Sequence, residues 1–180
     1  MADNLEEKQI YHITHLDNLE SILQCEVLWS HAKCIESGMG CEIVGMPEIK
    51  RSRLEECVVK CHPGTMVGEY VPFYFCPRSV MLYILHKGNH PDIDYRGGQQ
   101  PILHLQANLK GVICWAESQN IRWAYSDRNA RVRYARFFDD SEKINDIINW
   151  SAIDAFNWSD PQIQDCKQAE FLVYESFPWE

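Results

Sequence analysis

Glu170 occupies a position where an acidic side chain needs an explanation. It directly precedes the apolar residues of "KQAEFLVY" (167–174), a segment typical of a buried strand. Glutamate is rarely buried without a partner, so Glu170 could be a catalytic group. It could equally lie on the solvent face of an edge strand, and the local pattern favours neither interpretation.

His12 and Arg53 have side chains suited to a polar or charged ligand. His12 belongs to an expected strand, "QIYHIT" (9–14), and a neutral imidazole offers one hydrogen-bond donor and one acceptor. Arg53 lies in the basic stretch "KRSR" (50–53), where its guanidinium could hold a pyrophosphate or simply face solvent on a helix. Neither residue names a reaction by itself.

The cysteines and the missing motifs narrow the chemistry. Eight cysteines occur without a CxxC pair, which favours free thiols in a reducing compartment. The segment "CVVKCH" (57–62) could suggest zinc, but Cys34 and Cys41 supply only a loose second pair, so we expect no metal. No GxGxxG, GxxxxGK[ST], HExxH or GxSxG pattern occurs, so dehydrogenases, P-loop enzymes, zincins and α/β-hydrolases lack their motifs.

Charge is distributed unevenly along the chain. The net charge of −9 argues against a protein that coats nucleic acid non-specifically. Residues 122–136 nevertheless hold five arginines against one aspartate, a stripe that could bind a polyanion or pair with the acidic segment that follows. If the stripe binds a single strand, its bases could stack on Trp123, Tyr125 and Tyr134.

The elements that would position these residues mix strands and helices without strict βαβ alternation. We expect strands near 9–14, 70–76, 101–107, 111–116 and 169–175, and helices near 16–24, 46–56, 79–86, 140–150, 151–160 and 160–168. Between residues 31 and 70 we expect loops around one short helix. The pattern predicts a single α+β domain with a mostly antiparallel or mixed central sheet and peripheral helices. The acidic N-terminus and the absence of a long apolar run predict a cytoplasmic protein without membrane association.

Five separate blocks resemble the DarT family, the DNA ADP-ribosyltransferase toxins of DarT–DarG toxin–antitoxin systems. In the family's order they are "IYHITHLDNLESIL", "EYVPFYFCPRSVMLYIL", "YRGGQQPILHL", "ARFF" and "KQAEFLVYESFPW". The resemblance implies an ADP-ribosyltransferase domain over residues 10–180 after an N-terminal extension of residues 1–9. It further implies that the protein transfers ADP-ribose from NAD+ to a thymidine base in single-stranded DNA of preferred sequence and releases nicotinamide. We expect no metal and a monomeric protein, and the resemblance implies a DarG-like antitoxin with a macrodomain as partner.

The resemblance also assigns roles to individual residues. It implies that Glu170 and Arg53 are catalytic, and that NAD+ is bound by His12, Thr14, Tyr74, Arg51 and Gly98. It implies DNA binding by Arg78, Arg122, Arg128, Arg131, Arg133 and Arg136. Arg51 is the alternative to Arg53 if the local gap is placed differently.

Two other functions remain open from the sequence. The chain could be an ADP-ribosyltransferase that modifies protein or RNA, because the NAD+ half of the site would have the same residues. It could also be a non-catalytic nucleic-acid-binding module, in which Glu170 is structural and the Cys/His segment binds a metal.

Overall fold

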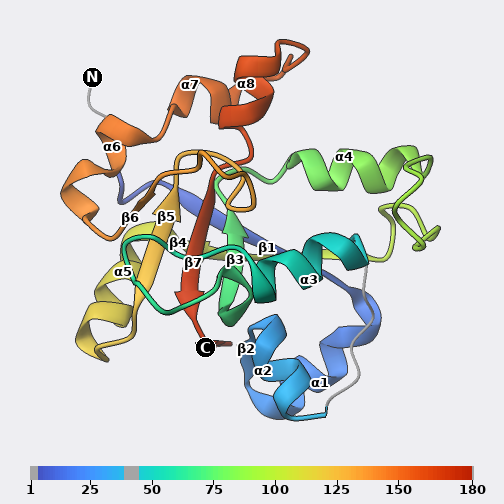
Figure 1. Ribbon diagram of the computed structural model, residues 1–180, viewed down its shortest axis with the longest axis horizontal. Helices are drawn as coiled ribbons and strands as arrows, with labels where there is room; N and C mark the ends of the chain where they lie inside the picture. Colours follow the sequence, from blue (N-terminus) through green and yellow to red (C-terminus); the bar gives the residue numbers. More distant parts are fainter. Residues whose placement is uncertain (1–3, 39–44, 180) are drawn as a thin grey trace.

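A six-stranded antiparallel sheet forms the centre of the protein. The computed structural model describes residues 4–38 and 45–179 (Figure 1). Across the sheet the strands follow the order β4 (Ile102–Asn108), β1 (Gln9–His15), β3 (Tyr70–Tyr74), β7 (Glu170–Tyr174), β5 (Trp123–Ser126) and β6 (Phe137–Phe138). All neighbouring strands pair antiparallel. A second, two-stranded sheet joins β2 (Val27–Trp29) to β8 (Ser176–Pro178).

Short helices surround the sheet. They are α1 (Leu19–Cys25), α2 (His31–Glu36), α3 (Pro47–Glu55), α4 (Val80–Lys87), α5 (Leu109–Ser118), α6 (Ile144–Ile147), α7 (Trp150–Asp154) and α8 (Pro161–Cys166). Among the described residues, the 3-10 turns η1 (Leu16–Asn18), η2 (Val67–Glu69) and η3 (Ser141–Lys143) directly precede α1, β3 and α6. In Figure 1, α1, α2 and β2 lie together beyond α3, while α7 and α8 lie at the end of the sheet where β7 begins. The expected α+β fold with an antiparallel sheet is confirmed.

The expected strand at 111–116 is wrong, because "GVICWA" lies within helix α5. Its buried residues Leu109, Val112, Ile113 and Ala116 recur at spacings of three and four, which places them on one face of a helix. Asn108 begins the helix, since its side chain accepts a hydrogen bond from the backbone N–H of Gly111 at 2.8 Å. The short apolar run is compatible with the period of a strand and with that of a helix, and its length alone did not decide between the two.

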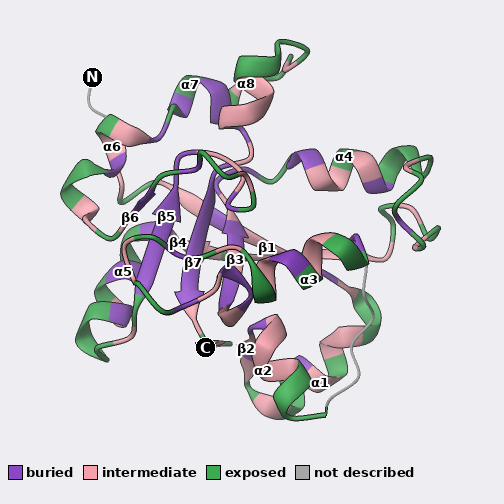
Figure 2. Cartoon of the chain, viewed as in Figure 1, coloured by how far each residue is buried: buried purple, intermediate pink, exposed green. Residues whose placement is uncertain are grey.

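The central strands are buried on both faces, as Figure 2 shows for β3, β5 and β7. Along β7, Phe171 and Val173 pack into the cluster that includes α5 and α7, whereas Leu172 packs into a second cluster on the other face. This alternation sets the side chain of Glu170 on the Leu172 face. The same face is covered by α3 and by residues 127–136, which supply the partners of Glu170.

The described helices are all too short and too polar to cross a membrane.

Candidate active site

Glu170 is a buried residue of a central strand. It begins β7, its residue surface is 2% exposed, and it stands opposite Tyr74 of β3. Because β7 lies between β3 and β5, the edge-strand interpretation of Glu170 is wrong. A carboxylate in this position must be satisfied by neighbouring groups, and its partners therefore define the site.

Arg53 and the backbone of Ala130 satisfy that carboxylate. The two terminal nitrogens of Arg53 donate to the two oxygens of Glu170, at 3.0 and 2.7 Å. The N–H of Ala130 donates to Oε1 at 3.0 Å. Burial alone would lower the pKa of Arg53, but the adjacent Glu170 raises it, so the guanidinium stays charged. The bidentate pair fixes the plane of the carboxylate as well as its position.

Arg51, two residues earlier on α3, has a different environment. Its guanidinium is largely exposed and pairs with Glu48 at 2.9 Å on the same helix. Of the two arginines that the sequence left as alternatives, the structure brings Arg53 to Glu170, because residues two apart on a helix do not share a face.

Ser126, which the sequence interpretation missed, anchors the backbone on both sides of the site. Its hydroxyl accepts a hydrogen bond from the N–H of Glu170 at 3.1 Å and donates to the carbonyl of Arg128 at 2.6 Å. Asn129 adds a second link, since its side-chain amide donates to Gln168 at 3.1 Å. The loop that contacts the carboxylate is thus tied to the strand that carries it.

A pocket of about 260 Å³ opens beside this pair, between β1 and β3 on one side and α1, α2 and α3 on the other. Four residues expected at the site, His12, Thr14, Tyr74 and Arg53, line it. His12 and Thr14 are two apart on β1 and so share a face, whereas Tyr74 stands opposite Glu170 on β7 and opposite Tyr11 on β1. Burial first, and then Glu170, raises the pKa of Tyr74, so its phenol stays neutral.

His12 presents a hydrogen-bond acceptor to the pocket. Its Nδ1 lies 2.8 Å from the carbonyl oxygen of Pro72, which can only accept, so Nδ1 carries the proton. Burial, partly opposed by this bond, lowers the pKa of His12. The ring is therefore neutral near pH 7, and Nε2 is left as an acceptor suited to a hydroxyl group.

His31 is a pocket residue that the sequence interpretation missed. It begins α2, a helix that Ser30 starts by accepting a hydrogen bond from the N–H of Lys33 at 3.2 Å. Burial, and then the charges of Lys50 and Arg53, lower the pKa of His31 to about 4. Its Nδ1 is buried without a hydrogen-bond partner among the described residues. The serine before "HAKCIE" could have indicated that a helix begins at His31, but the irregular composition of residues 31–70 suggested a loop instead.

Gly98 lies outside the group of residues that line the pocket. Its backbone has a φ of +68°, which explains a glycine in this turn without a ligand. A contact between Gly98 and NAD+ stays a prediction, as does one with Arg51.

Asp127 organises the predicted arginine stripe. Its buried carboxylate accepts hydrogen bonds from the backbone N–H of Arg136 at 3.0 Å and from the Nε of Arg136 at 2.9 Å. Arg128 donates to it at 3.2 Å and reaches Asp165 of α8 at 2.8 Å. Burial would raise the pKa of Asp127, but these hydrogen bonds lower it. Two of the arginines thus pair with acidic residues, but only the contact of Arg128 with Asp165 joins the stripe to the acidic segment that follows it.

The remaining arginines of the stripe divide between two places. Arg131 donates from Nε to Ser52 of α3 at 3.2 Å, and Arg133 is exposed, so both lie on the loop next to Glu170. Arg122 lies at the other end of β5, where its guanidinium covers the ring of Tyr174, the last residue of β7. The structure does not bring Arg122 to the candidate site. Arg78 is exposed beyond the end of β3.

Two of the three aromatic residues proposed to stack bases cannot do so. Trp123 and Tyr125 are buried in β5, where both pack into the core beside Phe171. That prediction is wrong, because β5 is an internal strand whose aromatic side chains face the core. Tyr134 is 62% exposed and lies under the guanidinium of Arg128, so it remains available.

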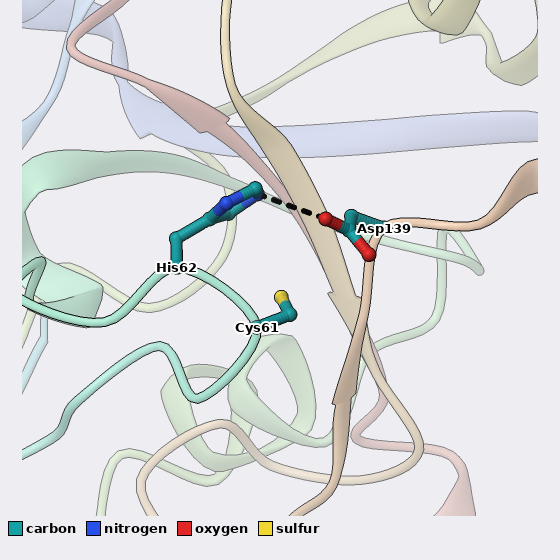
Figure 3. A group of neighbouring side chains, drawn as sticks. All are labelled: Cys61, His62 and Asp139. Carbon is teal, nitrogen blue, oxygen red and sulfur yellow. Dashed lines mark ion pairs between the residues drawn. The ribbon is translucent and has the colours of Figure 1, made fainter.

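Cys61, His62 and Asp139 form a cluster away from the pocket (Figure 3). His62 lies with Nε2 2.9 Å from the carbonyl of Trp123, to which it must donate, and 3.8 Å from Asp139. Burial, and then Asp139, raise the pKa of the Cys61 thiol to about 11. Cys57 lies apart, 3.8 Å from the carbonyl of Arg131, and Cys41 falls outside the described residues. The three possible ligand atoms lie within 4.8 Å of one another, but Nε2 of His62 is already engaged by a carbonyl oxygen.

The fold and site together define a transferase of the ADP-ribosyltransferase class: a buried carboxylate at a strand start, clamped by arginine, beside a pocket with a neutral histidine. The family model described as "ssDNA thymidine ADP-ribosyltransferase, DarT" matches residues 11–180. The chain therefore belongs to the DarT family.

Relatives and solved structures agree with this assignment. A DNA ADP-ribosyl transferase of Thermus sp. (strain 2.9) is 40% identical over 171 residues, which cover 94% of this chain and 76% of the relative. The structure of Thermus sp. 2.9 DarT in complex with ADP-ribosylated ssDNA superimposes with a TM-score of 0.83 at 38% identity, over 97% of this chain and 78% of that one. The same enzyme in complex with NAD+ gives a TM-score of 0.77 at 37% identity, with equal coverage.

Proposed function

We propose that this protein cleaves the nicotinamide–ribose bond of NAD+ and transfers ADP-ribose to a thymidine base in single-stranded DNA, with Glu170 as the catalytic carboxylate and Arg53 as its partner. The observation that carries the proposal is the bidentate Arg53–Glu170 pair at the edge of the pocket. The Thermus relative, solved with NAD+ and with ADP-ribosylated ssDNA, supports both substrates.

The pocket between β1 and α3 is the proposed NAD+ site. The free Nε2 of neutral His12 can accept a hydrogen bond from a ribose hydroxyl. Thr14 and Tyr74 add hydroxyl groups to the same wall. Arg53 and Lys50, which line the pocket from α3, can balance the pyrophosphate charge. This arrangement holds the ribose carbon next to Glu170, where the bond to nicotinamide breaks.

The reaction proceeds by exchange of one carbon–nitrogen bond for another. Nicotinamide leaves with the bonding electrons and becomes neutral, while positive charge develops on the ribose carbon. The carboxylate of Glu170 stabilises that charge and can accept a hydrogen bond from a ribose hydroxyl. A ring nitrogen of thymine then attacks the carbon and loses its proton, which Glu170 can accept and pass to water. This is the chemistry of a glycosyltransferase.

The loop formed by residues 127–136 is the proposed contact with DNA. Ala130 bonds to the catalytic carboxylate, and exposed Arg131 and Arg133 lie on the same loop, so the loop can bind phosphates next to the target base. Single-stranded DNA suits the site because a base in a duplex would first have to be unstacked, at a cost of a few kcal/mol. The loop would also select the neighbouring sequence.

The proposed activity also implies a partner and a location in the cell. The resemblance to toxins of DarT–DarG pairs supports a macrodomain antitoxin as partner and the cytoplasm, where DNA and NAD+ are both available, as the place of action. Residues 10–180 would act as one catalytic domain.

The variant Glu170→Gln tests the proposal. We expect transfer of label from NAD+ to a thymidine oligonucleotide to fall by about 10²–10⁴-fold or more, while the melting temperature of the protein shows that it remains folded. Glu175→Gln is the matched control, since Glu175 is an exposed carboxylate five residues along the same segment. Near-normal labelling by Glu170→Gln would refute the assignment.

The same assay separates the alternative functions. Parallel reactions with DNA, RNA and protein acceptors identify the substrate, and release of nicotinamide distinguishes an enzyme from a binding module. Labelling of RNA or protein in place of single-stranded DNA would overturn the acceptor but leave the NAD+ site intact.

A further inference from the structure

Three exposed aromatic side chains around the end of the sheet where β7 begins each have a cation over the ring. They are Tyr134 with Arg128, Phe156 with Arg78, and Tyr83 with Lys87, with distances to the ring centroid of 5.0, 5.0 and 5.3 Å. Phe156 is 84% exposed and Tyr83 is 45% exposed. A single exposed aromatic residue is ordinary, but repeated pairing of exposed rings with cations is a feature of surfaces that bind bases and phosphates.

Two of these pairs form a continuous surface. The ring of Trp158 lies 5.0 Å from that of Tyr83, edge-on at 86°, and Trp158 is two residues after Phe156. The loop 155–160 between α7 and α8 therefore lies against α4, joining Phe156, Trp158 and Tyr83 with their cations Arg78 and Lys87. We call these five residues the aromatic corner.

The backbone beneath the aromatic corner is firmly anchored. Ser79, itself buried, starts α4 by accepting a hydrogen bond from the N–H of Leu82 at 3.1 Å, and Leu85 of α4 is buried. On the other side, Asp160 starts α8 by accepting from the N–H of Gln162 at 2.8 Å. The exposed rings are thus presented by ordered segments at little entropic cost on binding.

The aromatic corner adjoins segments that lead to Glu170. Arg78 comes four residues after Tyr74, which stands opposite Glu170 in the sheet. Arg128, which bonds to Asp165 of α8, belongs to the loop that donates to the Glu170 carboxylate. In Figure 1, α4, α7 and α8 all lie around the end of the sheet where β7 begins. A strand whose thymidine enters this site has the aromatic corner beside it.

We propose that the aromatic corner is a binding site for bases of the single-stranded DNA that flank the target thymidine, an inference that rests on the proposed function. Bases stack on Phe156 and the Tyr83–Trp158 pair, and Arg78 and Lys87 neutralise the adjacent phosphates. The net charge of −9 makes such local contacts necessary, because the protein as a whole repels DNA. Stacking accepts any base, so this site contributes affinity and length dependence rather than the preferred sequence.

The variants Phe156→Ala and Tyr83→Ala test this site. With an oligonucleotide that has bases on both sides of the target thymidine, we expect each to raise the KM for DNA by roughly 10-fold, a typical effect of losing one stacking residue. We expect kcat and the KM for NAD+ to be unchanged. With an oligonucleotide whose flanking positions are abasic, variant and wild type should have equal KM. Phe156→Tyr keeps the ring and is the matched control.

Three results would overturn the site. Unchanged KM for DNA in both alanine variants would exclude it, and so would equal losses with intact and abasic flanks, which would place the effect at the catalytic centre. Loss of antitoxin binding without a change in KM for DNA would identify a protein-binding surface instead. If the wild type modifies no DNA at all, the proposed function itself fails, and direct binding of an unreacted oligonucleotide measured by anisotropy still tests the aromatic corner.

Discussion

The pocket beneath α3 and the loop 127–136 meet at Glu170, yet they are built from opposite kinds of side chain. The pocket is lined mainly by apolar and neutral polar side chains, including His12 and His31, whose pKa values burial lowers, with Lys50 and Arg53 as its cations. The loop is rich in arginines that are exposed or paired with carboxylates, as Arg136 is with Asp127. Strands hold the first region, whereas side-chain hydrogen bonds hold the second.

The contrast matches what each substrate requires. NAD+ is one molecule of fixed shape, so a concave site on rigid strands can be complementary to it before it binds. A single strand of DNA is flexible and charged, so it is better bound by exposed cations and rings on anchored loops. Arg53 and Ala130 join the two regions, because Arg53 belongs to the pocket, Ala130 belongs to the loop, and each donates to the carboxylate of Glu170.

Removing Arg53 should have the largest effect, because it disrupts the junction of both regions. We expect Arg53→Gln to lower transfer by about 100-fold or more and to lower the free energy of unfolding by about 3 kcal/mol, since it leaves Glu170 buried without its counter-ion. Single-turnover assays and urea denaturation measure the two quantities. Arg51→Gln, an exposed change on the same helix, should alter stability by less than about 0.5 kcal/mol. Equal behaviour of the two variants would contradict the assignment of Arg53.

Asp127→Asn should separate the two regions by weakening the DNA side alone. The amide cannot hold Arg128 and Arg136 as charge-assisted partners, so the loop should loosen. We expect a rise of about 10-fold in the KM for DNA and a loss of roughly 2 kcal/mol in stability, with the affinity for NAD+ unchanged. Asp139→Asn, an exposed change just beyond β6, is the control. A comparable loss of NAD+ affinity would show that the regions are not independent.

Replacing His31 should produce the smallest effect of the three changes. The effect should be confined to the pocket and should appear in the pH dependence of the free energy of unfolding. Its folded pKa of about 4 lies below the unfolded value near 6.5, so below pH 6.5 the unfolded state binds the extra proton. Stability should therefore fall as the pH drops from about 6.5 to about 4. For this half-buried ring we expect roughly 1 to 2 kcal/mol after allowance for solvent screening.

Thermal or urea unfolding at several pH values compares the wild type with His31→Gln, which should lack this component, and with His86→Gln, an exposed histidine of α4. If the wild type and His31→Gln lose stability in parallel over this range, His31 is not the group responsible.

The sequence predicted some residues of the candidate site and missed others. Glu170 and His12 stand in strands with clear patterns, and both expected strands are present. The sequence did not decide whether Arg53 or Arg51 belongs to the site, because a basic run of four residues does not reveal which helix face meets the sheet. His31 and Ser126 were missed, since their roles depend on neighbours distant in the chain.

The aromatic residues show the same limit. Trp123 and Tyr125 were expected to stack bases because they adjoin arginines, yet both lie on the same face of β5, which packs into the core. The sequence did not indicate a role for Phe156 or Tyr83 in binding, because a lone aromatic residue in a polar loop or an apolar helix has no distinctive pattern. Phe156 pairs with Arg78 only where two segments meet, whereas Tyr83 and Lys87 are four residues apart on α4.

The sequence by itself determined the fold class and the family, and through the family it singled out Glu170 as the candidate catalytic carboxylate, because periodicity and local motifs are properties of contiguous residues. Only the tertiary structure decided which arginine pairs with Glu170, which nitrogen of His12 faces the pocket, and which aromatic rings are exposed. These depend on contacts between residues up to 117 positions apart, such as Arg53 and Glu170, and such contacts arise from packing rather than from local preference.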